Sequence, residues 1–80
     1  MMNLLHWRLL VAVADASNIS RAAEEVGMTQ SGASQAIAQL EASLGFAVFT
    51  RERRHVGVTA QGERVVKEAR SMLARLDAIR

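Results

Sequence analysis

Cysteine, proline and tyrosine are absent from this 80-residue chain, and the only aromatic residues are one Trp and two Phe. The absence of cysteine excludes disulfides and thiolate metal sites, and it fits a reducing compartment. Without proline, and with half of the residues apolar, the composition favours helices around an aliphatic core. A single domain of this size buries only roughly 60% of its unfolded surface, so we expect a second copy or another domain to add stability.

Charge and long apolar runs are also scarce. Residues 1–50 contain two arginines and four acidic residues, whereas residues 51–54 read Arg-Glu-Arg-Arg and form the only dense basic cluster. The apolar runs are too short to span a membrane, and the first residues lack the basic start and long apolar segment of a signal peptide. We therefore expect a soluble cytoplasmic protein without a membrane partner.

No catalytic constellation is visible in the sequence. His6 and His55 have no adjacent pair of acids, and no glycine-rich phosphate loop follows an expected strand. The paired aromatic strand motifs that stack RNA bases are missing as well. We expect no enzyme, and neither a metal nor a cofactor in this chain.

Two helices are expected before the first internal glycine. Asn3 can cap a helix that runs to about Ala16, and a shorter helix, capped by Asn18 or Ser20, ends at Gly27. The apolar positions at helical spacing are Leu5, Leu9, Leu10, Val11 and Val13 in the first helix and, in the second (residues 19–26), Ala22, Ala23 and Val26. A third helix follows after about three residues, which is the helix-turn-helix pattern.

The third helix is expected between a cap at Thr29 and a glycine stop at Gly45. Its apolar stripe is Ala33, Ile37, Leu40 and Leu44, and its opposite face is Ser31, Gln35, Ala38 and Ala42, with Gln39 beside it. A solvated helix face is normally rich in Lys and Glu, whereas this face carries no charge and little bulk. It can lie close against another surface while offering hydrogen bonds, which predicts a DNA-recognition helix.

Beyond Gly45 the apolar residues alternate, so residues 48–50 and 56–58 are predicted to be short strands. The basic stretch 51–55 forms the tip between them, and a helix-turn-helix followed by such a hairpin is a winged helix. Alone, the basic tip would be interpreted as a solvated loop. Beside a recognition helix without charge, it is the expected source of cations for phosphates.

The last helix is expected to begin at a Thr59 cap and to run to Arg80. Its apolar residues recur at the spacing of a heptad repeat and form one stripe, the seam, of Val65, Ala69, Met72, Leu76 and Ile79. Val66 and Leu73 lie beside this stripe and make it wider. At about 1.5 Å per residue the helix is roughly 30 Å long, too long for this domain to cover. We expect its start to pack on its own domain and its end to pack on a second chain. Trp7 is expected in the core or at a partner contact, with stacking on a ligand as the alternative.

Five segments combine into one recognisable pattern, namely 18–23 (NISRAA), 29–37 (TQSGASQAI), 40–45 (LEASLG), 48–51 (VFTR) and 58–62 (VTAQG). From about Leu5 to Arg80 the sequence resembles the N-terminal domain of LysR-type transcriptional regulators. The resemblance implies a mainly α fold with a small β-hairpin. It is a winged helix-turn-helix over residues 1–59, followed by a linker helix over 60–80 that dimerises antiparallel with its mate.

The resemblance also implies a longer natural chain. Members normally carry a C-terminal effector-binding domain with a fold like periplasmic binding proteins, and they often form tetramers. We expect this chain to be a truncated piece rather than a stand-alone version, and a small-molecule inducer to bind the missing domain.

The chain departs from the family pattern at three positions. Ser31 stands where the family usually has Pro, and Gly32 loosens the start of the recognition helix further. Leu10 replaces a common Phe, which is interpreted as a core exchange. Gln35 replaces a frequent Arg or Lys and can pair with adenine in the major groove.

The residues expected to contact DNA lie at the start of the second helix, in the first half of the third helix and in the wing. They are Asn18, Ser20 and Arg21, then Thr29, Gln30, Ser31, Ser34 and Gln35, then Arg51, Arg53 and Arg54. Thr29 and the helix N-terminus would contact phosphate, and Arg53 or Arg54 would enter a neighbouring narrow minor groove. Pairing of Arg51 with Glu41 or Glu52 is the alternative for that residue.

We expect a homodimer that binds a partly palindromic promoter operator in double-stranded DNA, in the bacterial cytoplasm and associated with the nucleoid. The expected dimer interface is Val65, Ala69, Met72, Leu73, Leu76 and Ile79. The alternative is a winged-helix module that docks another protein through its neutral third helix and binds no DNA directly. The low charge of residues 1–50 favours that alternative.

Overall fold

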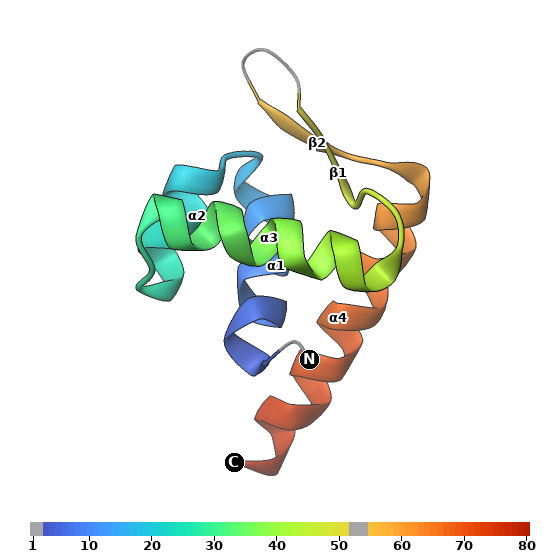
Figure 1. Ribbon diagram of the computed structural model, residues 1–80. Coiled ribbons are helices and arrows are strands. Elements are labelled where there is room, and N and C mark those ends of the chain that lie inside the picture. Colours follow the sequence, from blue (N-terminus) through green and yellow to red (C-terminus); the bar gives the residue numbers. More distant parts are fainter. Residues whose placement is uncertain (1–2, 52–54) are drawn as a thin grey trace.

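The computed structural model describes residues 3–51 and 55–80. In this part of the chain the elements are, in order, α1 (Leu4–Ala16), α2 (Ile19–Val26), α3 (Gln30–Leu44), β1 (Phe49–Arg51), β2 (Val56–Val58) and α4 (Ala60–Ile79). Figure 1 shows α3 crossing in front of α1, the hairpin rising at one end and α4 descending to the C-terminus. The predicted architecture, a winged helix-turn-helix followed by a long C-terminal helix, is confirmed.

The four helices start at the predicted caps. A side-chain oxygen accepts a bond from the amide three residues on in each case, in the pairs Asn3–His6, Asn18–Arg21, Thr29–Gly32 and Thr59–Gly62, over 2.9 to 3.0 Å. Of the two candidates for capping α2, Asn18 is therefore the cap. These bonds satisfy amides that have no partner inside their helices.

The core lies where α1, α2 and α3 meet the root of the hairpin and the first half of α4. Its buried side chains are Leu9, Leu10, Val13, Ala22, Ala23, Ala33, Ala36, Ile37, Leu40, Val48, Phe49, Val66 and Ala69. Leu10 is fully buried, as expected of a core exchange. The prediction for Leu5 was wrong, because it lies in the first turn of α1 and is 40% exposed.

The first strand begins one residue later than predicted. Val48 is buried, but its amide donates to the Glu41 carboxylate over 2.7 Å and its carbonyl accepts from the Thr59 amide over 2.9 Å. Because both backbone groups are already bonded at this junction, the antiparallel ladder starts at Phe49, which pairs with Val58. The second strand lies where it was predicted.

Gly62 allows the hairpin root to approach α4 closely. A Cβ at this position would lie 2.1 Å from the carbonyl oxygen of Val48, which no side chain tolerates. The Thr59 hydroxyl also donates to the carbonyl of Ala47 over 2.7 Å. The short connection from β2 into α4 is therefore fixed by a capping threonine and a glycine.

Ion pairs join α1 to α4 near both ends of the contact. Arg8 bonds Asp77 over 2.8 Å, and Arg70 bonds Asp15. The hydrogen bonds from these arginines hold the pKa of both aspartates below their usual range, and Asp15 in turn raises the pKa of Arg70. All four side chains are substantially exposed, so each pair contributes little to folding.

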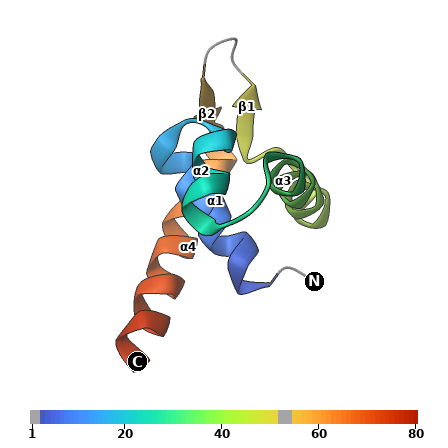
Figure 2. The ribbon, with the colours of Figure 1, turned by 90° about the vertical axis from the view of Figure 1, so that its left-hand side faces the viewer.

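The end of α4 extends away from the rest of the chain, as the two ribbon views agree (Figures 1 and 2). Within the described residues, none of the helices has the length and apolarity needed to cross a membrane.

Candidate nucleic-acid interface

The outward face of α3 carries no charged group. Ser31, Gln35, Ala38, Gln39 and Ala42 are all exposed. The other side of the helix packs into the core, so this face presents only amide, hydroxyl and methyl groups to solvent. Such a surface offers hydrogen-bond donors and acceptors without the bulk that would keep a flat partner at a distance.

The start of α3 is available to an anion. Thr29 and Gln30 are exposed, and the threonine hydroxyl caps the Gly32 amide. Gln30 and Ser31 are the first two residues of the helix, so their amides have no acceptor within it. Amides at a helix N-terminus are a common site for phosphate oxygens. Ser34, one turn on, is half-buried.

The start of α2 offers a second polar edge. Ser20 and Arg21 are exposed. Asn18 is also exposed, but its side-chain oxygen already accepts from the Arg21 amide. Its side-chain nitrogen is thus the part that remains for an outside contact.

The hairpin places Arg51 at the exposed end of β1. Among the described residues no ion pair joins Arg51 to Glu41, because the Glu41 carboxylate accepts from backbone amides instead. The alternative pairing of Arg51 with Glu41 is therefore wrong. The predicted wing residues Arg53 and Arg54, and the other alternative partner Glu52, lie outside the described residues.

The hairpin is attached to the α1–α2 turn as well as to α3. The amide of Val56 donates to the carbonyl of Ser17 over 3.0 Å. Ser17 adopts a left-handed conformation with φ of 53°, which turns the chain between the two helices. The wing and the helix-turn-helix are therefore bonded together, and Figure 2 shows the hairpin rising beside α3, which is seen nearly end-on.

His55, at the end of the basic stretch predicted to form the hairpin tip, is exposed next to β2. The role of Glu41 was not predicted from the sequence: its carboxylate links α3 to the root of the hairpin. The sequence contained one sign of this role. Glu41 is an acid in the last turn of a helix, where the helix dipole disfavours negative charge, so it could be expected to need a compensating partner.

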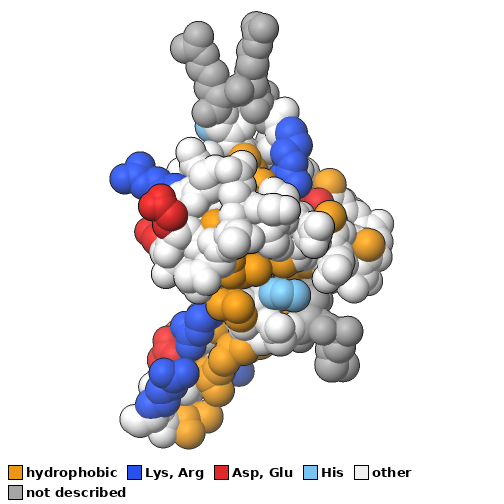
Figure 3. All heavy atoms as spheres, turned by 60° about the vertical axis from the view of Figure 1, so that its left-hand side comes forward, with side chains coloured by type: hydrophobic (Ala, Val, Ile, Leu, Met, Phe, Trp, Pro, Cys, Tyr) orange, Lys and Arg blue, Asp and Glu red, His pale blue; other side chains and the backbone are white. Residues whose placement is uncertain are grey.

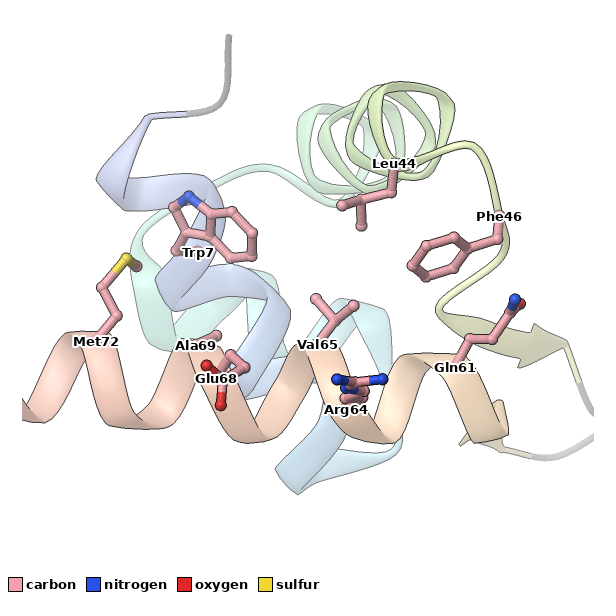
Figure 4. Close-up of a pocket in the computed structure, with 9 residues that line it drawn as sticks. All are labelled: Trp7, Leu44, Phe46, Gln61, Arg64, Val65, Glu68, Ala69 and Met72. Carbon is pink, nitrogen blue, oxygen red and sulfur yellow. The ribbon is translucent and has the colours of Figure 1, made fainter.

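An apolar groove of about 620 Å³ lies on another side of the molecule, between α1, the end of α3 and α4. It is lined by Trp7, Leu44, Phe46, Gln61, Arg64, Val65, Glu68, Ala69 and Met72. In Figure 4 the side chains of Trp7, Leu44, Phe46 and Val65 point toward a common space above α4. Trp7 is only half-buried, so one chain alone leaves this apolar surface open.

The predicted dimer residues divide into two groups. Ala69 and Leu73 are 2% and 7% exposed within the single chain, so they have little surface left for a partner. Met72 and Ile79 are 39% and 80% exposed, and Val65 and Leu76 lie between these extremes. Figure 3 shows hydrophobic side chains continuing down the lower part of the molecule, where α4 extends.

The order of elements, the polar face of α3 and the basic hairpin define the class of winged helix-turn-helix proteins. Within this class, residues 4–63 match the family model described as bacterial regulatory helix-turn-helix protein, lysR family. The chain belongs to the LysR family.

Curated relatives support this assignment. The chain is 40% identical over 78 residues to the HTH-type transcriptional regulator IlvR of Caulobacter vibrioides, covering 98% of this chain and 26% of that protein. It is 40% identical over 72 residues to the Hca operon transcriptional activator HcaR of Escherichia coli, covering 90% and 24%. The chain thus spans about a quarter of the length of these relatives, both of which are named as regulators of transcription.

Solved structures share the fold. The BenM DNA-binding domain in complex with catB site 1 DNA superposes with a TM-score of 0.92 at 31% identity, covering 98% of this chain and 87% of that one. A full-length OxyR variant from Pseudomonas aeruginosa gives 0.91 at 32% identity, covering 99% and 27%.

Proposed function

We propose that this chain binds double-stranded DNA sequence-specifically, as the DNA-binding domain of a LysR-type transcriptional regulator. The observation that carries the proposal is the exposed, uncharged face of α3, held beside a hairpin whose strand ends in an exposed arginine. Base edges in the major groove are read by short polar side chains, whereas phosphates require cations and amides. The two kinds of surface are present here on two adjoining elements.

In the proposed complex α3 enters the major groove with its first half. Gln30, Ser31, Ser34 and Gln35 reach base edges or the phosphates beside them, and Thr29 lies at the backbone. The start of α2, with Asn18, Ser20 and Arg21, holds the neighbouring phosphates. The wing, with Arg51, Arg53 and Arg54, lies on the next stretch of backbone or in the adjacent minor groove.

The proposed active unit is a homodimer whose copies contact each other through α4. Residues 1–59 form the DNA-binding unit in this proposal, and 60–80 form the linker and dimerisation helix. An antiparallel pairing that sets Val65 opposite Ile79 of the second copy also sets Met72 opposite itself. That is the self-complementary arrangement that a two-fold axis requires. It would cover the exposed Ile79 with the open groove beside Val65.

We further propose that the whole protein carries an effector-binding domain beyond this chain. A small-molecule inducer would bind there, and tetramers would form from the dimers. Because its target is promoter DNA, the protein would work in the bacterial cytoplasm, on the nucleoid. The two-fold axis of the dimer would make the operator a partial palindrome.

The test is a fluorescence-anisotropy titration of labelled duplex DNA at several salt concentrations. Phosphate contacts make the affinity fall with salt, with a slope proportional to their number. Replacing Arg53 and Arg54 together with Ala should weaken binding to all duplexes and lower the slope by roughly one unit per lost contact. Arg75→Ala is the matched control, because it removes an exposed arginine from α4.

An unchanged slope in the Arg53/Arg54 variant would remove the wing from the proposal. A wild-type chain that binds no duplex at moderate salt would leave the protein-docking alternative. The similar proteins, which are named as regulators or solved with DNA, give that alternative no support.

A further inference from the structure

Glu41 connects the last turn of α3 to the root of the hairpin. Its Oε2 accepts from the amide of Val48 over 2.7 Å and from the amide of Phe49 over 3.1 Å. Both amides belong to buried residues, with Val48 fully buried and Phe49 4% exposed. One carboxylate oxygen thus satisfies two successive backbone donors at the point where the chain enters β1.

The position of Glu41 has no explanation within its own helix. An acid in the last turn lies near the negative end of the helix dipole, where a cation is preferred. No ion pair offsets its charge among the described residues, in which the salt bridges are Arg8–Asp77 and Arg70–Asp15. The compensation comes from the two amides, and charge-assisted bonds of this kind are stronger than neutral ones.

The hairpin needs contacts with the rest of the chain to hold its orientation. It has three residues in each strand, and a two-stranded hairpin is marginally stable by itself. Over the described residues, the two Glu41 bonds are the only hydrogen bonds that join α3 to the hairpin or its root. The other bonds at the root lead elsewhere, from Val56 to Ser17 and from Thr59 to Val48.

We propose that Glu41 is a positioning residue for DNA binding, because it fixes the angle between the recognition helix and the wing. The inference rests on the proposed function, in which these two elements contact DNA together. Glu41 itself lies six residues beyond Gln35, about 9 Å further along the helix axis, and thus outside the base-reading half of α3. It sets where Arg51 lies relative to the bases that α3 reads.

The first test is a double-mutant cycle in DNA binding. Arg51→Ala should weaken binding and lower the salt slope by about one unit. Glu41→Ala should produce the same loss through a misplaced wing, and adding Arg51→Ala to it should then cost little more. The preference between two duplexes that differ at one base contacted by α3 should stay within about twofold, because that half of the helix is unchanged.

Two further variants separate positioning from folding. Glu41→Gln keeps an oxygen that can accept the amide bonds, so it should recover most of the affinity and the salt slope. Glu25→Ala removes the same charge from an exposed site on α2 and should leave the coupling with Arg51 unchanged. Additive effects of Glu41→Ala and Arg51→Ala, with an unchanged salt slope in Glu41→Ala, would overturn the proposal.

The second test needs no DNA. Residual dipolar couplings of the amides in β1, β2 and α3 should show that Glu41→Ala turns the hairpin relative to α3, while Glu41→Gln does not. A hairpin with unchanged orientation in Glu41→Ala would also overturn the proposal. If the wild-type chain binds no DNA but the hairpin turns, the proposed function fails while the structural role of Glu41 stands.

Discussion

At the scale of single residues, Gln35 is the side chain to which the proposed complex gives the most direct part in base choice. It is exposed in the first half of α3, and a glutamine amide can make two bonds to adenine in the major groove. Gln35→Ala should cost about 1–3 kcal/mol at one base position and relax the preference there, measured by binding to duplexes substituted at each position. Ser43→Ala, exposed near the other end of the helix, is the control. A loss that is equal on all duplexes would mean that Gln35 reads no base.

Gly62 is the residue on which the packing of the wing against α4 depends most. Gly62→Ala would put a Cβ 2.1 Å from the Val48 carbonyl oxygen, so the hairpin root or α4 must move. We expect a loss of roughly 1–3 kcal/mol in the free energy of unfolding, measured with urea. Ser71→Ala, at an exposed position of the same helix, should be neutral or slightly stabilising. Equal stability of Gly62→Ala and the wild type would contradict this packing.

Gln35 and Gly62 differ in how far their roles can be predicted from the sequence. The exposure of Gln35 follows from helical periodicity alone, because the apolar stripe fixes the opposite face. The role of Gly62 does not, since it depends on a carbonyl 14 residues earlier in the chain. The bonds of Glu41 likewise join residues seven and eight positions apart through a turn, beyond the reach of a local pattern.

At the scale of elements, the helices were predictable because their signals are local. Asn or Thr marks the start of each helix, glycine marks the ends of α2 and α3, and the apolar spacing marks the buried side. The four N-terminal caps form the predicted bonds. The first strand was misplaced by one residue because the backbone groups of Val48 bond outside the ladder. The exposure of Leu5 was missed because it depends on which neighbouring element covers that part of α1. The apolar spacing within α1 does not contain that information.

The pairing of α1 with α4 should depend on pH. The unfolded chain binds protons at Asp15 and Asp77 more readily than the folded chain, because the arginines lower both pKa values in the folded state. The stabilisation is therefore complete at pH 7 and is lost as the pH falls below about 4 and through the folded pKa values.

Asp15→Asn tests one of these pairs. It should cost less than about 1 kcal/mol at pH 7, since the pair is exposed, and less again near pH 2, as measured by urea unfolding at both pH values. Glu25→Gln, on the exposed side of α2, should show no such difference. A cost of Asp15→Asn that is the same at both pH values would mean that the pair with Arg70 is not its cause.

At the scale of the whole molecule, the open apolar surface is where the proposed dimer would form. The groove beside Trp7 and the exposed end of α4 remain uncovered in one chain. In the proposed dimer, Leu76→Asp should place a charge in the seam and produce monomers in sedimentation experiments. Ala78→Asp, with the same charge on an exposed position of α4, should stay dimeric. A dimeric Leu76→Asp variant would place the interface elsewhere.

In the proposed function, a two-fold symmetric pair of chains binds DNA sequence-specifically. Selection of bound duplexes from a random DNA pool, followed by sequencing, tests this most directly. We predict a partly palindromic consensus in which changing one base pair costs about 1–3 kcal/mol of binding free energy. Bound DNA without a common sequence, held no more tightly than the starting pool, would contradict it.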